Sequence, residues 1–187
     1  MAVKGGAAAA GIVADTTGIL GAMVGASPTI REITIDIENA TQAYCLINPR
    51  FHLTRGGCLK TLPIELYPAT RDGAVFAKKM STATGCSGVF TYDLSLNGAY
   101  SAKKMAVMFS VPFDFNIYDN YLAVGVFDNN KLCDEQLFNE MYNLNSLEFE
   151  KGKAADGILR YEYSNVVIMA SMSDSFVPFL RLKVKQT

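Results

Sequence analysis

Residues 31 to 39 read REITIDIEN, and the alternation of apolar and polar residues in this stretch decides the fold class. Ile33, Ile35 and Ile37 fall on one face of an extended chain, and most of the charged residues fall on the other face. A period of two predicts a half-buried β-strand. The stretch FLRLKVK at 179–185 alternates in the same way.

Comparable segments recur along the chain, separated by turn residues such as Asn97-Gly98 and Arg71-Asp72-Gly73. We expect further strands at Val75–Lys79, Gly88–Leu94, Met105–Val111, Leu122–Phe127, Ile158–Tyr163 and Val166–Met172. Many short strands at short spacing are typical of a sandwich or barrel. The sequence therefore predicts a mainly β fold, a compact antiparallel β-sandwich.

One segment of the body has a helical period instead. CDEQLFNEMYNL at 133–144 places Leu137 and Met141 one turn apart, and Phe138 and Tyr142 at the same spacing. Acidic residues at its start complement the helix dipole. We expect a short amphipathic helix flanking the sandwich near 133–144.

The first thirty residues differ in composition from the rest, with Asp15 the only charge between Gly5 and Ile30. Four interpretations compete: a secretory signal, a permanently embedded helix, a helix that inserts conditionally, and an Ala/Gly-rich leader without function. As a helix, residues 5–27 would span about 34 Å, enough to cross a hydrocarbon core of about 30 Å.

The free energy of insertion favours the conditional helix. Five aliphatic residues contribute roughly −0.3 to −0.6 kcal/mol each, whereas Asp15 near the centre costs about 2.5 to 3.5 kcal/mol. A bundle in which Asp15 faces water and glycines face neighbouring helices would insert more favourably. The predicted N-terminal amphipathic helix presents an apolar stripe, a glycine face and one acid, formed by Ile12, Val13, Asp15, Gly18, Ile19, Leu20, Gly21 and Met23.

Charge and motifs exclude several function classes. With 17 basic and 18 acidic residues the net charge is −1, so nucleic acid is an improbable partner. The four cysteines have no metal-ligand spacing and only His52 could join them, so we expect no metal site and no cofactor. No nucleophile, zinc-protease or phosphate-loop motif occurs, and the sequence predicts a protein that is not an enzyme.

An aromatic stretch suggests a binding surface. FSVPFDFNIYDNY at 109–121 carries five rings around Pro112, which ends the preceding strand because proline cannot donate to a ladder. We expect Phe109 and Phe115 to lie mostly in the core, and Tyr118, Tyr121 and Tyr142 to be mostly exposed. Tyrosine suits a membrane interface and attracts quaternary ammonium groups such as choline.

The stretches AVMFSVPFDFNIYDNY, ATG at 83–85 and DEQLFNEMY, with REITIDIEN and INPRF upstream, resemble the actinoporin family of sea-anemone cytolysins and their actinoporin-like relatives. That resemblance implies a β-sandwich flanked by two helices. It also implies recognition of phosphocholine lipids, preferably sphingomyelin, then oligomerisation and formation of an ion-conducting pore by the N-terminal helix.

The resemblance also implies roles for individual residues. The headgroup site would comprise His52, Ser87, Ser110, Pro112, Tyr118, Phe138 and Tyr142. The membrane interface would comprise Phe113, Ile117, Tyr121 and Leu122. His52 stands where the family has an arginine, and the family's exposed tryptophans are missing.

The resulting expectation is one domain over residues 1–187, with 1–28 as a detachable pore-forming segment and 29–187 as the sandwich body. The protein would be a secreted, soluble monomer that binds phosphocholine lipids and forms a homo-oligomer on a target cell membrane. The alternative is a lectin-like module on the same fold that binds lipid or glycan and never makes holes.

Overall fold

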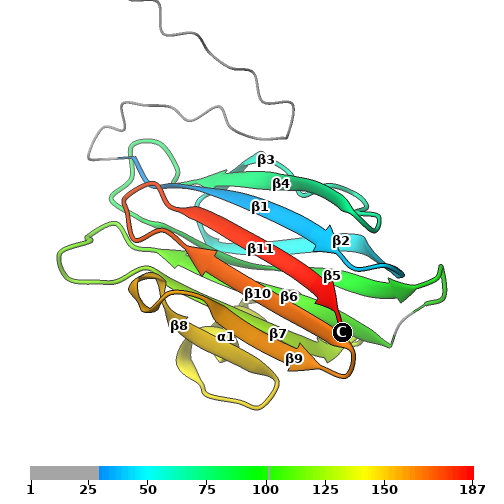
Figure 1. The fold of residues 1–187 in the computed structure, drawn as a ribbon. Coiled ribbons are helices and arrows are strands. Elements are labelled where there is room, and N and C mark those ends of the chain that lie inside the picture. The colour runs from blue at the N-terminus through cyan, green and yellow to red at the C-terminus, as the bar shows by residue number, and fades with distance from the viewer. Residues whose placement is uncertain (1–29, 101) are drawn as a thin grey trace, which may run out of the picture.

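The computed structural model describes residues 30–100 and 102–187, and their strands form two stacked sheets (Figure 1). One sheet has the strand order β3-β4-β1-β11-β10-β9, and the other has the order β2-β5-β6-β7-β8. The strands are β1 (Glu32–Ala40), β2 (Tyr44–Arg55), β3 (Gly57–Lys60), β4 (Thr70–Ala77), β5 (Cys86–Leu96), β6 (Lys103–Val111), β7 (Tyr121–Asp128), β8 (Phe149–Lys153), β9 (Leu159–Tyr163), β10 (Val166–Met172) and β11 (Phe179–Gln186). The mainly β, sandwich-like prediction is confirmed.

The core fills the space between the sheets. The three isoleucines of β1 point into it and are fully buried, as their alternation predicts. Strands β5, β6 and β7 are buried on both faces: Phe90 and Val107 face the other sheet, whereas Val89 and Met108 face outward under a helix. Burial on both faces explains why these three strands read as apolar runs rather than as alternating sequence.

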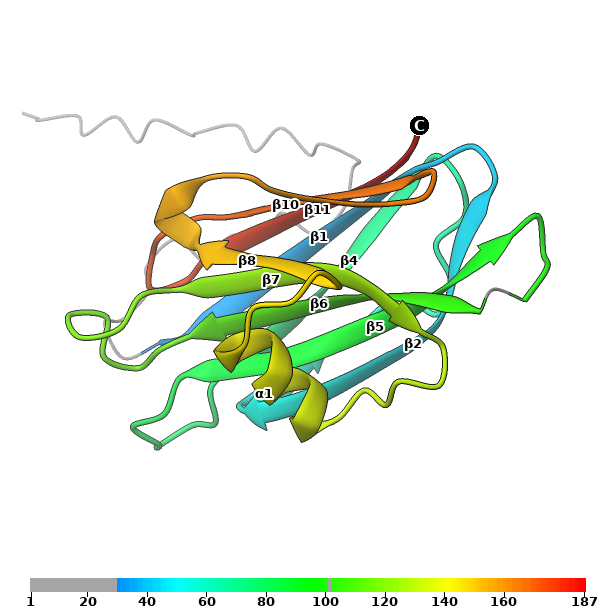
Figure 2. The ribbon, with the colours of Figure 1, turned by 90° about the horizontal axis from the view of Figure 1, so that it is seen from below.

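The helix that covers them is α1 (Glu135–Asn143), which lies across the outer face of the second sheet (Figure 2). Asp134 caps it by accepting hydrogen bonds from the backbone N–H groups of Gln136 and Leu137, at 3.0 Å each. Leu137, Phe138 and Met141 form its buried face. The predicted second helix is thereby confirmed, within two residues at its start and one at its end.

Several details differ from the sequence prediction, in which strands β2, β3 and β8 were absent. β1 pairs with β11 in parallel, so the first sheet is mixed rather than wholly antiparallel. Arg71-Asp72-Gly73 is not a turn: it lies inside β4, where Arg71 pairs with the Asp36 carboxylate across the ladder. The longest strand, β2, was missed because Pro49 falls where its register against β5 shifts, which breaks the alternation.

Within residues 30–100 and 102–187, no helix is long and apolar enough to cross a membrane. The predicted N-terminal helix and all eight of its named residues, from Ile12 to Met23, lie outside the described residues.

Candidate functional site

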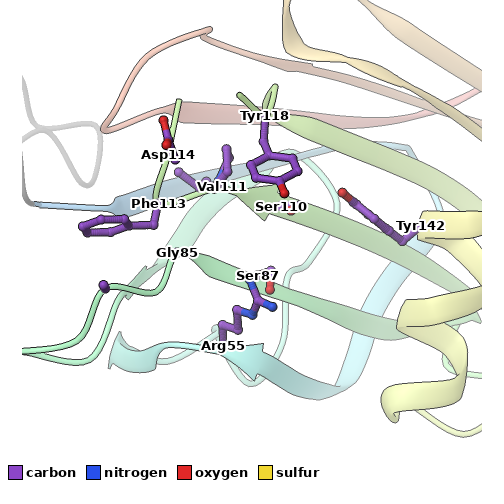
Figure 3. Close-up of a pocket in the computed structure, with 11 residues that line it drawn as sticks. Arg55, Gly85, Ser87, Ser110, Val111, Phe113, Asp114, Tyr118 and Tyr142 are labelled. Atoms are coloured by element: carbon purple, nitrogen blue, oxygen red, sulfur yellow. The ribbon is translucent and has the colours of Figure 1, made fainter. Parts of the chain in front are cut away.

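A cavity of about 390 Å³ opens on the outer face of the second sheet, beside the end of α1 (Figure 3). Its floor is formed by Ser87 of β5 and Ser110 of β6, which are directly opposite each other in the ladder. The other residues that line it are Arg55, Ala83, Gly85, Val111, Pro112, Phe113, Asp114, Tyr118 and Tyr142. The fold thus brings together five of the seven predicted headgroup residues, namely Ser87, Ser110, Pro112, Tyr118 and Tyr142.

The wall that follows β6 is a turn organised by Asp114. Its side chain accepts a hydrogen bond from the Asn116 N–H at 3.0 Å, and its backbone carbonyl accepts one from the Tyr118 N–H at 3.1 Å. This local network positions Tyr118 over the cavity, with 60% of the residue exposed.

Arg31 holds the same wall from behind. This buried residue at the start of the sandwich donates hydrogen bonds to the carbonyl oxygens of Pro112 and Phe113, at 3.0 Å each. Its guanidinium also lies over the rings of Phe113 and Phe176, at 5.3 and 4.6 Å from their centroids. Burial lowers the pKa of Arg31 and Asp114 opposes that shift, but arginine stays charged in proteins. We infer that Arg31 positions the wall without touching a ligand.

Arg55 was missed by the sequence analysis, and among the described residues it supplies the only cationic side chain that lines the cavity. It ends β2 opposite Ser87, at the second register shift of that strand and just before the turn at Gly56, whose φ is +107°. In the part of the chain that the structure describes, no carboxylate pairs with its guanidinium. The signal in the sequence was an arginine directly before a glycine pair, and its position depends on the unpredicted strand β2.

The opposite side of the cavity carries two tyrosines. Figure 3 shows Tyr118 and Tyr142 on the side away from Arg55, with both hydroxyls directed inward. Neither hydroxyl has a hydrogen-bond partner within the described part of the chain. Phe138 does not line the cavity: it lies on the buried face of α1 and stacks on Tyr142, with centroids 5.6 Å apart and planes 12° apart. In this position Phe138 supports the Tyr142 ring, and its predicted contact with a headgroup stays a prediction.

His52 also lies outside the cavity. Its Nε2 is 2.7 Å from the Glu135 carboxylate, which also accepts a hydrogen bond from the Thr54 hydroxyl at 3.0 Å. These contacts attach the start of α1 to β2, and the His52 hydrogen bond holds the pKa of Glu135 below its usual value. Arg55, rather than His52, is the residue that reaches the cavity, and the predicted role of His52 at a headgroup stays a prediction.

Replacing His52 with Ala should leave ligand binding in the cavity unchanged and lower stability slightly. We expect a loss of less than about 1 kcal/mol at neutral pH, since the pair with Glu135 is partly exposed. The depressed pKa of Glu135 means that the stabilisation exists above its unfolded value and disappears as pH falls through the folded value. Urea unfolding of both proteins from pH 7 to pH 3 measures this, and a difference that grows towards pH 3 would contradict the assignment.

The predicted interface residues divide into three groups by exposure. Ile117 is 69% exposed on the β6–β7 loop beside Tyr118, as an interface residue should be. Tyr121 is half-buried with its ring 5.9 Å from that of Tyr142, and Phe113 is half-buried in the cavity wall. Leu122 is fully buried in the core because strand alternation turns it inward after Tyr121, so its assignment to the interface is corrected.

Taken together, the cavity offers one guanidinium without a carboxylate partner, the hydroxyls of two serines and two tyrosines, one carboxylate and three aromatic rings. A guanidinium matches phosphate geometry through paired N–H donors. Tyrosine faces and a nearby carboxylate attract a quaternary ammonium group. The set suits a zwitterionic ligand with phosphate at one end and a cation at the other. The described residues contain no group of three His, Cys, Asp or Glu side chains suited to a metal ion.

Comparison with known proteins places the chain in a family. The family described as sea anemone cytotoxic protein matches residues 3–179. This chain belongs to that family. The resemblance to actinoporins is therefore confirmed, and the match covers most of the residues described above and most of those that precede them.

The individual relatives match only part of this chain. The chain is 35% identical over 124 residues to DELTA-alicitoxin-Pse1b of Phyllodiscus semoni, covering 62% of this chain and 49% of the relative. It is 34% identical over 92 residues to Tereporin-Ca1 of Terebra anilis, covering 49% and 46%. The chain thus spans about half the length of these relatives. Among solved structures, the lipid binding protein Nakanori has the same fold at a TM-score of 0.65 and 12% identity, covering 82% of this chain and 70% of that one.

Proposed function

We propose that this member of the family is a pore-forming cytolysin that docks phosphocholine lipids in the cavity between Arg55 and Tyr142. One observation carries the proposal: an arginine that has no acidic partner lies on one side of the cavity, and two tyrosines that face inward lie on the other side. The phosphate of the headgroup would lie against Arg55 and the hydroxyls of Ser87 and Ser110. The choline would lie between the tyrosine rings, on the side of Asp114.

Exclusion of water by the bound headgroup gives the proposed binding step a physical reason. Arg55 is exposed, and its hydrogen bonds to phosphate would become stronger where the headgroup and the cavity walls leave fewer water molecules to compete and screen. The tyrosine rings sit at the mouth, where a side chain with one apolar and one polar end is favoured at a membrane surface. Ile117 would enter the interface beside them.

The proposed pore step involves residues 1–28, for which the sequence predicts a helix with an apolar stripe and a glycine face. In this account the protein is secreted as a soluble monomer with one domain and binds its target membrane through the cavity. It then forms a homo-oligomer in which the N-terminal segment leaves the sandwich and lines an ion-conducting pore. Support comes from membership of a cytotoxic protein family.

Titration with soluble phosphocholine tests the first step. We expect saturable binding that shifts the NMR signals of Ser87, Ser110 and Tyr118, with phosphoethanolamine binding more weakly because its smaller cation interacts less with the rings. Galactose and N-acetylglucosamine serve as controls for the lectin-like alternative. Binding of either sugar at the cavity, without binding of phosphocholine, would contradict the proposal.

A further inference from the structure

The loop from Lys78 to Gly85 forms the wall of the cavity opposite Tyr118, and its tip carries an exposed apolar residue. Met80 is 91% exposed, more than Ile117 on the facing loop. Ala83 and Gly85, at the end of the loop, line the cavity. Met80 is therefore close in sequence to the residues of this loop that line the cavity.

Hydrogen bonds inside this loop hold its tip in place. The Lys78 ammonium donates to the Thr82 carbonyl at 2.8 Å, and the Thr82 hydroxyl donates to the Lys79 carbonyl at 2.7 Å. Ser81 has a φ of +60°, the left-handed conformation of a tight turn. Met80 is thus exposed on a structured turn, so ordering it on a surface costs less than ordering a residue of a free chain.

The two loops on either side of the cavity are fixed to each other. A Cβ on Gly85 would overlap the Val111 carbonyl oxygen, so the two backbones touch at the base of the cavity. Further out, the Lys78 ammonium lies 5.7 Å from the centroid of the Phe113 ring. Figure 2 shows the β4–β5 and β6–β7 loops at the same end of the sandwich. Met80 and Ile117 therefore flank one cavity at a set separation.

The residue beside Met80 matches the surface of a bilayer. Lys79 is exposed, and within the described ranges no carboxylate pairs with its ammonium group. A lysine next to an inserted apolar side chain can extend its ammonium to the level of the lipid phosphates while its methylene groups stay in the apolar layer. A protein partner would require an acidic group for Lys79, whereas a phosphocholine bilayer supplies phosphates all around it.

We propose that Met80 is a second membrane anchor, which inserts on the opposite side of the headgroup cavity from Ile117 while Lys79 contacts lipid phosphate. This inference rests on the proposed function, because it takes the cavity as the lipid site. It assigns bilayer contact to a loop that the sequence analysis left without a role. Two anchors around one headgroup would fix the tilt of the sandwich on the membrane, which a single anchor on the β6–β7 loop cannot do.

The test compares Met80→Ser with Leu132→Ser. Leu132 is a matched control because it is also exposed, at 66%, follows a lysine, and lies on the segment that leaves the other end of the sandwich after β7. We expect Met80→Ser to weaken partitioning onto phosphatidylcholine–sphingomyelin vesicles about tenfold, since a methionine side chain loses its burial. Leu132→Ser should have no effect. Neither variant should change the affinity for soluble phosphocholine.

Insertion itself can be observed because the chain contains no tryptophan. Met80→Trp and Leu132→Trp each introduce a single fluorophore. Emission from position 80 should shift to shorter wavelength with vesicles and be quenched by brominated lipid, and emission from position 132 should not. If Met80→Ser partitions like the unmodified chain, or the emission of bound Met80→Trp protein stays unchanged, the second anchor is refuted. If the unmodified chain binds neither phosphocholine nor vesicles, the proposed function fails together with it.

Discussion

Deleting residues 1–27 is expected to abolish release of a trapped dye from phosphatidylcholine–sphingomyelin vesicles, down to the level of vesicles without protein. The reason is that the deletion removes the segment proposed to line the pore, together with its predicted apolar stripe and glycine face. Binding to the same vesicles should persist, because every residue described as lining the headgroup cavity lies between Arg55 and Tyr142.

The control for this deletion is to show that the truncated protein still folds and still binds the vesicles. Far-UV circular dichroism and co-sedimentation of the truncated chain should match those of the full chain. If the truncated protein still releases dye, residues 1–27 do not form the pore. If neither protein releases dye but both bind, the protein is a non-lytic lipid-binding module on the same fold.

The second large effect is expected from Arg55. Replacing Arg55 with Ala should weaken phosphocholine binding about ten- to a hundredfold. Hydrogen bonds to a charged group contribute roughly 1.5 to 3 kcal/mol, and no other cationic side chain of residues 30–100 and 102–187 lines the cavity. Arg55→Lys should recover only part of the affinity, since an ammonium group cannot bind phosphate through two parallel hydrogen bonds. Calorimetric titration with phosphocholine and co-sedimentation with vesicles both measure the loss.

Arg50→Ala is the matched control for this substitution. Arg50 is exposed on the same strand, pairs with Thr91 of β5 in the ladder and does not line the cavity. Its removal changes the net charge by the same amount and should leave binding unchanged. Equal losses in the two variants would show that bulk charge, not the cavity, drives association, and that result would contradict the assignment of Arg55.

The sequence predicted those parts of the fold in which local pattern and burial agree. Strand β1 alternates because one of its faces is core, and α1 has both a cap and an apolar face, so both were found. Strand β2 was not found, because its proline sits at a bulge that only the pairing with β5 reveals. Arg71-Asp72-Gly73 resembles a turn locally, but pairing with β1 makes it part of a strand.

The difference between local pattern and long-range pairing also explains which residues of the site could be predicted. Ser110, Pro112 and Tyr118 lie within one short stretch, so an unusual run of sequence could identify them together. Arg55 comes from a strand far away in the sequence, and although the glycine pair after it marks a turn, its position also depends on a register shift that has no clear signature in the chain. His52 was assigned to the site because it stands where the resembling family has an arginine. The structure turns His52 towards Glu135 instead.

The central claim is that docking of a phosphocholine headgroup in this cavity leads to a pore. Dye release from phosphatidylcholine vesicles with and without sphingomyelin, combined with co-sedimentation of the same samples, tests it most directly. The account predicts that the protein binds these vesicles and releases the dye, and that soluble phosphocholine suppresses both. Binding without release would contradict the pore, and release that soluble phosphocholine does not reduce would contradict the headgroup site.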